Sequence, residues 1–182
     1  MIGRPANGRS WVLATVLAVA LAGCGHGAKH TPSADASPTS ILTTTTVDPK
    51  AKVVADYEAF WAAYLEAANP MNPEDPRLRA HATGTELQHV GSAFLARKGL
   101  GQIIKGTFDF APIVSSVEAD NAVLRDCYFD HTLVYVAGTG QPVGQPDTVR
   151  QLVTVRLVLD PATSTWKVSE ITHEGSGCTS AS

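Results

Sequence analysis

The sequence predicts an α+β domain in which three helices cover one face of an antiparallel sheet. Apolar residues recur at spacings of three and four between positions 49 and 99, which is the period of a helix with one buried face. From position 107 to position 173 they alternate instead, as in strands with one buried face. Clusters of Gly, Pro and Asp separate the alternating runs and are typical of turns.

A first helix is expected from Asp48 and Pro49 up to the residues before Pro70. The Asp48 side chain can cap the helix, and proline is favoured in the first turn, where its missing N–H costs nothing. The residue ahead of a proline is disfavoured in the helical conformation, so the helix ends before Pro70. Its wide apolar face consists of Val53, Tyr57, Phe60, Trp61, Tyr64, Leu65 and Ala68.

Two shorter helices are expected next. Asp75 and Pro76 repeat the same start signal, for a helix that runs to about Ala82. Thr83 and Glu86 have the spacing of a capping box, in which each side chain bonds the other residue's backbone N–H. A third helix therefore begins there and ends at Gly99.

The second half of the domain is expected to form the sheet. The predicted strands are 107–117, 122–129, 133–136, 149–159 and 166–173, with turns at 118–121 and 160–165 and a Gly/Pro loop at 138–146. The first two strands are expected to form a hairpin around the turn at 118–121.

The first 23 residues have the features of a signal peptide. Arg4 and Arg9 provide a positive start, and the apolar run 11–21 is shorter than the roughly 20 residues that span a bilayer. The stretch from Leu21 to Cys24 (LAGC) resembles the lipobox of bacterial lipoproteins, in which the cysteine is acylated and the chain is cut before it. The resemblance implies lipidation at Cys24 and a protein held on the extracytoplasmic face of the cell membrane, since two acyl chains anchor stably. The alternative is an ordinary secretory signal with a coincidental cysteine.

Residues 24–47 are rich in Ser, Thr, Pro, Ala and Gly and are interpreted as the acylated N-terminus and a flexible tether. His26 and His30 have the spacing of a helical metal pair, but nothing in the segment favours a helix, and we expect no metal or other cofactor. Residues 48–182 then form the folded domain.

Charge argues against nucleic acid as a partner. The chain carries a net charge of −3, which becomes −5 without the two arginines of the leader, and the sequence has no basic run.

The cysteine count fits an exported lipoprotein. With Cys24 acylated, Cys127 and Cys178 remain, and an oxidising compartment favours a disulfide between them. The alternative is two free, buried thiols.

The order of these elements resembles the NTF2-like, or SnoaL-like, cone superfold, specifically that of exported actinobacterial (mycobacterial-type) lipoproteins. The resemblance covers residues 48–178. It is carried by YEAFWAAYLEAANP, DPRLRAHATG, GLGQIIKGTFDF, AVLRDCYFD and TWKVSEITHEGSGC, with a cysteine after Arg125 and Asp126 and another near the C-terminus. It implies helices packed on a strongly curved antiparallel sheet that encloses a cavity. Some relatives are enzymes, such as ketosteroid isomerase and polyketide cyclases, and many only bind, so the fold does not select a function.

Six aromatic residues are candidates to line such a cavity: Tyr57, Trp61, Tyr64, Phe108, Phe110 and Trp166. An aromatic stripe at helical spacing more often fills a core, and both interpretations stay open.

Asp126, Asp130 and His131 are the weak candidates for an acid and base set, and His173 lies on the predicted last strand. Ordinary pairing at the surface, for example of Arg125 or Arg156 with a carboxylate across the strand, explains them equally well. No motif of a known catalytic or nucleotide site is present.

Three functions are compatible with the sequence. The first is a non-enzymatic module that binds an apolar ligand or an envelope protein. The second is a small-molecule isomerase, cyclase or dehydratase acting in the cone. The third is an envelope accessory subunit that forms a homodimer through its sheet. A buried carboxylate near a tyrosine in the cavity would favour the enzyme, and a wholly apolar cavity the binding module.

Overall fold

A computed structural model describes residues 48–179. The predicted signal peptide, the predicted lipidation site Cys24 and the predicted tether up to residue 47 lie outside the described residues. Within them, three helices precede eight strands, and all strand pairs are antiparallel. The predicted α+β class is therefore confirmed.

The first helix, α1 (Pro49–Ala68), begins as the sequence predicts, with the Asp48 side chain accepting a hydrogen bond of 3.0 Å from the Lys50 N–H. Two successive residues of α1 attach it to the sheet. The Asp56 carboxylate accepts the backbone N–H of Trp166 at 2.7 Å, and the Tyr57 hydroxyl donates to the Asp126 carboxylate at 2.9 Å. These contacts fix both the position and the rotation of the helix.

The second helix, α2 (Pro76–His81), is also capped as expected, by Asp75. The third, α3 (Gly84–Gly99), has the predicted bounds, but the predicted capping box is wrong: the Thr83 side chain makes no cap hydrogen bond. Glu86 is instead a buried residue, 6% exposed, that turns towards the sheet. The Thr83 N–H donates to the Val168 carbonyl at 2.9 Å, so the backbone is paired with a strand at this point.

The strands form two sheets. The larger has the order β2–β4–β7–β8, with β3 also paired to β4, and the smaller has the order β1–β5–β6. Their bounds are β1 (Gln102–Lys105), β2 (Phe108–Asp109), β3 (Ile113–Val117), β4 (Asn121–Asp130), β5 (Leu133–Val136), β6 (Pro142–Val143), β7 (Gln151–Asp160) and β8 (Thr165–Ser176).

The predicted hairpin exists, and its second arm is the continuous β4, but its first arm is broken. The arm expected at 107–117 consists of β2 and β3, with Pro112 in the gap, where it has no N–H to donate to a neighbouring strand. The arm extends back to β1, which pairs with β5 and was not predicted as a strand. The short β6 lies within the predicted loop at 138–146.

Gly106 marks the bend between β1 and β2. Its φ is +142°, and a Cβ there would lie 2.4 Å from the His131 carbonyl oxygen. Only glycine allows the two arms to approach this closely.

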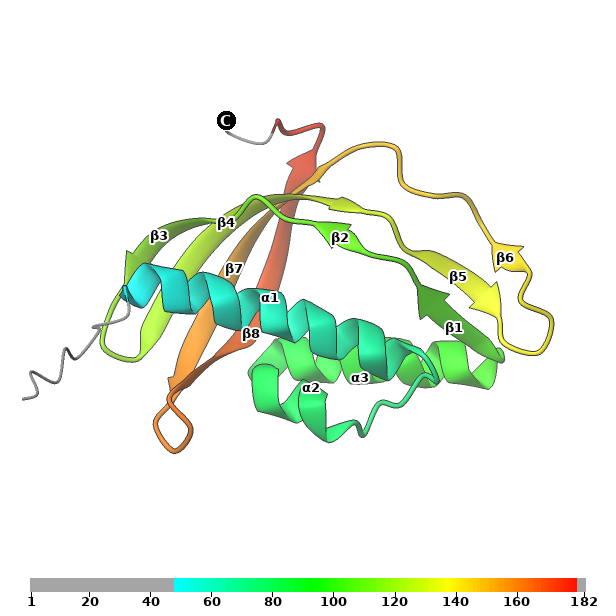
Figure 1. Ribbon diagram of the computed structural model, residues 1–182, viewed down its shortest axis with the longest axis horizontal. Coiled ribbons are helices and arrows are strands. Elements are labelled where there is room, and N and C mark those ends of the chain that lie inside the picture. Colours follow the sequence, from blue (N-terminus) through cyan, green and yellow to red (C-terminus); the bar gives the residue numbers. More distant parts are fainter. Residues whose placement is uncertain (1–47, 180–182) are drawn as a thin grey trace, which may run out of the picture. The chain divides into compact units, whose positions relative to one another are not determined.

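All three helices contact β8 and lie on the inner side of the bent sheet (Figure 1). The core between these layers includes Phe60, Phe94, Leu124 and Val155, none of them exposed. Burial of these large side chains supplies the main stabilisation of the domain.

The outer face of the larger sheet carries ion pairs between strands. Arg125 of β4 bonds Glu174 of β8 at 3.0 Å, and Arg156 of β7 lies 3.4 Å from Glu170. Pairing of arginines with carboxylates across the strands, the alternative explanation offered for Asp126, Asp130 and His131, does occur here, but the partners are Glu174 and Glu170.

A disulfide joins Cys127 to Cys178, with an S–S distance of 2.04 Å. It links the middle of β4 to the segment after β8, 51 residues further along the chain. The pairing favoured by the sequence is thus present. In residues 48–179 no helix has the length and apolar character needed to cross a membrane.

Replacing both Cys127 and Cys178 with Ala should lower the free energy of unfolding by up to about 4 kcal/mol, because the unfolded chain regains the freedom of a long loop. Thermal unfolding of the full chain should show a melting temperature lower by on the order of 10 °C. Wild-type protein treated with a reductant is the matched control and should melt with the double variant. Equal melting of oxidised wild type and double variant would contradict a stabilising bond.

Candidate functional site

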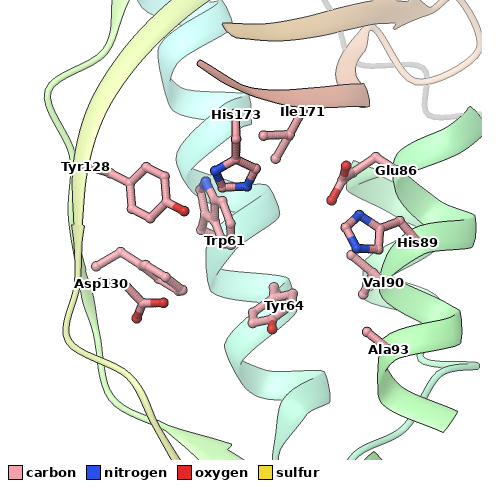
Figure 2. A pocket seen from close by; sticks show the side chains of 11 residues that line it. Trp61, Tyr64, Glu86, His89, Val90, Ala93, Tyr128, Asp130, Ile171 and His173 are labelled. Carbon is pink, nitrogen blue, oxygen red and sulfur yellow. The ribbon is translucent and has the colours of Figure 1, made fainter. Parts of the chain in front are cut away.

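A cavity of about 180 Å³ lies between α1, α3 and the inner side of the sheet. Figure 2 shows Tyr128 and Asp130 of β4 on one side, Glu86 and His89 of α3 on the other, and Trp61 and Tyr64 of α1 between them. The remaining lining residues are Val90, Ala93, Phe108, Ile171 and His173. Three different layers of the fold therefore contribute to one site.

Aromatic rings form one continuous part of the lining. The Trp61 ring centroid lies 4.5 Å from that of Phe108, 5.4 Å from that of Tyr64 and 5.8 Å from that of Tyr128. Such spacings are typical of packed aromatic clusters, in which each ring holds its neighbours in place. The cluster forms one rigid aromatic wall of the cavity.

Two carboxyl groups face this aromatic wall from opposite sides. Burial raises the pKa of Glu86, while His89 and the Ile171 backbone act in the other direction. Burial also raises the pKa of Asp130, although the Thr132 N–H donates to its carboxylate at 2.7 Å. No Lys or Arg side chain is among the lining residues. Neither carboxyl therefore has a cationic partner of that kind inside the cavity.

Two tyrosine hydroxyls complete the polar groups. Burial is the main cause that raises the pKa of Tyr64 to about 12, and it raises the pKa of Tyr128 as well. Both hydroxyls thus stay protonated at neutral pH and can donate a hydrogen bond to a ligand. His89 and His173 are exposed and lie at the open side of the cavity.

Three of the six predicted lining residues are in this lining: Trp61, Tyr64 and Phe108. The other three are not. Tyr57 is completely buried and packs against Phe110, with ring centroids 5.7 Å apart, and Trp166 is a core residue next to α1. The rings of Tyr57, Phe110 and Trp166 fill the core because they lie near the part of α1 that bonds the sheet directly.

The structure does not bring Asp126, Asp130 and His131 together as one acid and base set. Asp126 is 1% exposed and accepts hydrogen bonds from the Tyr57 hydroxyl and the Ala111 N–H, outside the cavity lining. His131 lies on the surface, 2.8 Å from Asp109. Of the three, only Asp130 lines the cavity, because the alternation of β4 places positions 126, 128 and 130 on its inner side and the chain turns away after 130.

Sequence reasoning missed Glu86, His89 and Tyr128 as lining residues. The spacing of Thr83 and Glu86 fits a capping box, so Glu86 was predicted to cap the helix and not to line a cavity. A usable signal was present, since positions 86, 89, 90 and 93 recur at helical spacing and share one face of α3. Tyr128 and Asp130 likewise share one face of a strand.

Comparison with known proteins found no matching family model and no matching curated protein. Among solved structures, the chain is similar to the intermembrane space region of the chloroplast protein ARC6. The TM-score is 0.46 at 12% sequence identity, and the likeness covers 65% of this chain and 94% of that chain. A likeness of this degree transfers no function to this chain.

Within residues 48–179, no group of three or more His, Cys, Asp and Glu side chains is placed to hold a metal ion. The chemistry that the site offers is that of carboxyl, imidazole and phenol groups beside aromatic rings.

Replacing Glu86 with Gln should stabilise the protein at neutral pH, because a raised pKa means that the ionised carboxylate is unfavourable in the folded state. We expect a melting temperature higher by a few degrees, about 4 °C for each kcal/mol gained. The gain should shrink as the pH falls through the raised pKa, where wild-type Glu86 takes up a proton.

Thermal unfolding from pH 8 to pH 4 measures this difference. The exposed Glu118→Gln is the matched control and should melt like the wild type across the range. A loss of stability in Glu86→Gln at neutral pH would show that the carboxylate is satisfied by the fold itself.

Proposed function

We propose that this chain is a lipid-anchored extracytoplasmic module with an NTF2-like cone, and that it binds a small molecule in the cavity between α1, α3 and the sheet. The cavity carries the proposal: it is a preformed space of about 180 Å³ with a rigid aromatic wall and a few convergent polar groups. Such a combination is the usual composition of a ligand site.

The NTF2-like part of the proposal is supported by the order of the elements. Three helices precede an antiparallel sheet, and the longest helix lies along its inner side (Figure 1). Residues of that helix line the cavity. The anchoring part is supported by the lipobox resemblance at Cys24 and by the disulfide, which suits an oxidising compartment.

The size of the cavity limits its ligand. Drug-sized molecules occupy about 300–1,000 Å³, and a cavity of about 150 Å³ holds benzene. A ligand here has on the order of six to ten non-hydrogen atoms. Glu86 and Asp130 each have a backbone partner but no Lys or Arg beside them, and a ligand with a polar or charged group can use their remaining hydrogen-bonding capacity.

A second candidate function is a small-molecule isomerase, cyclase or dehydratase. The observation that favours it is the raised pKa of Glu86 and Asp130 beside two tyrosine hydroxyls, because general acids and bases need pKa values near the working pH. The two candidates differ in whether a bound ligand is changed.

The third candidate, a homodimer formed through the sheet, has less support. Ile113 and Val158 are the large exposed apolar side chains on the five-stranded sheet within the described residues, and its outer face carries ion pairs. An interface core is usually more apolar than this.

Ligand binding is tested by titrating the purified full chain with small fragments of six to ten non-hydrogen atoms and following the NMR signals. Ala93→Phe fills the cavity and should abolish binding, whereas Ala96→Phe, an exposed position of the same helix, should not. Fragments recovered unchanged support a binding module, and converted fragments support the enzyme. Binding that survives in Ala93→Phe would place the ligand elsewhere.

Anchoring is tested by mass spectrometry of the N-terminal peptide from the native host. We expect Cys24 as the first residue, carrying a diacylglycerol, and loss of incorporated fatty acid in Cys24→Ala. Cys127→Ala with Cys178→Ala is the control and should keep the label. An intact Met1, or an unchanged fatty acid label in Cys24→Ala, would contradict the proposed anchor.

A further inference from the structure

The cavity lining contains acidic side chains but no Lys or Arg. Glu86 and Asp130 supply two carboxyl groups, while no Lys or Arg lines the cavity. His89 and His173 are the only other ionisable groups of the lining besides the tyrosines, and both are exposed. At neutral pH the inner part of the cavity is therefore suited to positive charge.

Glu86 has no cationic partner at close range, although the Ile171 backbone and the nearby His89 favour its charged form. It is 6% exposed, and in the described part of the chain no Lys, Arg or His side chain lies within ion-pair distance of it. Its carboxyl points into the cavity in Figure 2, opposite Asp130. A buried carboxylate without a cationic partner costs free energy that a bound cation would recover.

The aromatic wall adds a second, independent attraction for a cation. Trp61, Tyr64, Phe108 and Tyr128 line the cavity, and the centroid of each of the other three rings lies within 5.8 Å of the Trp61 ring centroid. The negative faces of such rings attract ammonium groups, and quaternary ammonium is recognised by clusters of this kind. An anion would meet two carboxyl groups and the same ring faces, and both contacts are repulsive.

We propose that the cavity binds a small organic cation, an amine or quaternary ammonium compound, held between Glu86, Asp130 and the aromatic rings of Trp61, Tyr64, Phe108 and Tyr128. This inference rests on the proposed binding function and names its ligand class. The small volume admits a compact cation of about six to ten non-hydrogen atoms and excludes long polyamines in a folded form.

Three probes of nearly equal shape test the charge requirement on the full chain by calorimetric titration. Choline is the cation, 3,3-dimethylbutan-1-ol is its neutral isostere, and trimethylacetate is a compact anion. We expect choline to bind at least about tenfold more tightly than the alcohol, and trimethylacetate not to bind.

Two variants assign the effect to the cavity. Glu86→Gln should weaken choline by about tenfold and leave the neutral alcohol unchanged, because it removes the charge and keeps the shape. Glu118→Gln, an exposed carboxylate in a turn, should change neither affinity.

The pH dependence supplies a further readout. Choline affinity should fall as the pH decreases from 8 to 5, while the affinity for the alcohol stays constant. Protonation of both carboxyls removes their charge. The groups that act on the two carboxyls are His89 on α3, the Ile171 backbone on β8, Tyr64 on α1, Tyr128 on β4, and His131, Thr132 and Asp147 in the loops. His173 on β8 lines the same cavity.

The outcomes separate the two proposals. Equal affinity for choline and the alcohol, tighter binding of trimethylacetate, or an unchanged choline affinity in Glu86→Gln would overturn the cation proposal and leave the binding function standing. If fragments bind in the cavity but choline does not, the cation proposal also fails. If no fragment and no probe binds, the binding function fails with it.

Discussion

The attachment of α1 to the sheet is the constraint on which the rest of the domain depends. Asp56 and Tyr57 are neighbours in the helix, yet they bond different strands, Asp56 to the backbone of β8 and Tyr57 to Asp126 of β4. Two anchors on different strands allow only one rotation of the helix about its axis. That rotation places Phe60 in the core and turns Trp61 and Tyr64 towards the cavity.

Because Asp126 is almost completely buried, losing the Tyr57 hydroxyl would leave a carboxylate without one of its two donors, which is costly. A residue that sequence reasoning placed among catalytic candidates thus has a structural role.

The cavity lies beside α1, where Trp61 and Tyr64 line it, next to the completely buried Tyr57 and Phe60. Gly106 lets the backbone of residues 131 and 132 approach, and Pro112 lies in the gap between β2 and β3. The third helix closes the opposite side and brings Glu86 into the space instead of using it at the helix end. The fold therefore tolerates a buried carboxyl group with a raised pKa at this position. A domain selected for stability alone gains nothing from such a group, and this is the physical reason for assigning the cavity a ligand.

The two polar environments of the domain differ in how their charges are satisfied. On the outer face, Arg125 and Arg156 each face a carboxylate across the strands, and water screens both pairs. In the cavity, Glu86 and Asp130 face aromatic rings and tyrosine hydroxyls and have no Lys or Arg beside them. Charges that form ion pairs within the protein require nothing from outside, whereas carboxyl groups without a cationic partner beside a small cavity favour a cationic ligand. This contrast, more than the fold class, connects the structure to a function.

Local chemistry allowed the sequence by itself to determine several features. The starts of α1 and α2 follow from Asp48, Asp75 and their prolines, the class of fold follows from two periodicities, and the disulfide follows from a count of cysteines. Three of the four lining aromatics, Trp61, Tyr64 and Phe108, were also among the candidates, because an apolar helix face must meet the sheet somewhere. The division between core and cavity was decided by the tertiary structure alone, since Tyr57 and Trp61 are equivalent in the helical pattern and only Trp61 lines the cavity. Glu86 and Asp130 come from segments more than forty residues apart, and no local sequence pattern predicts that the fold brings them into the lining of one cavity.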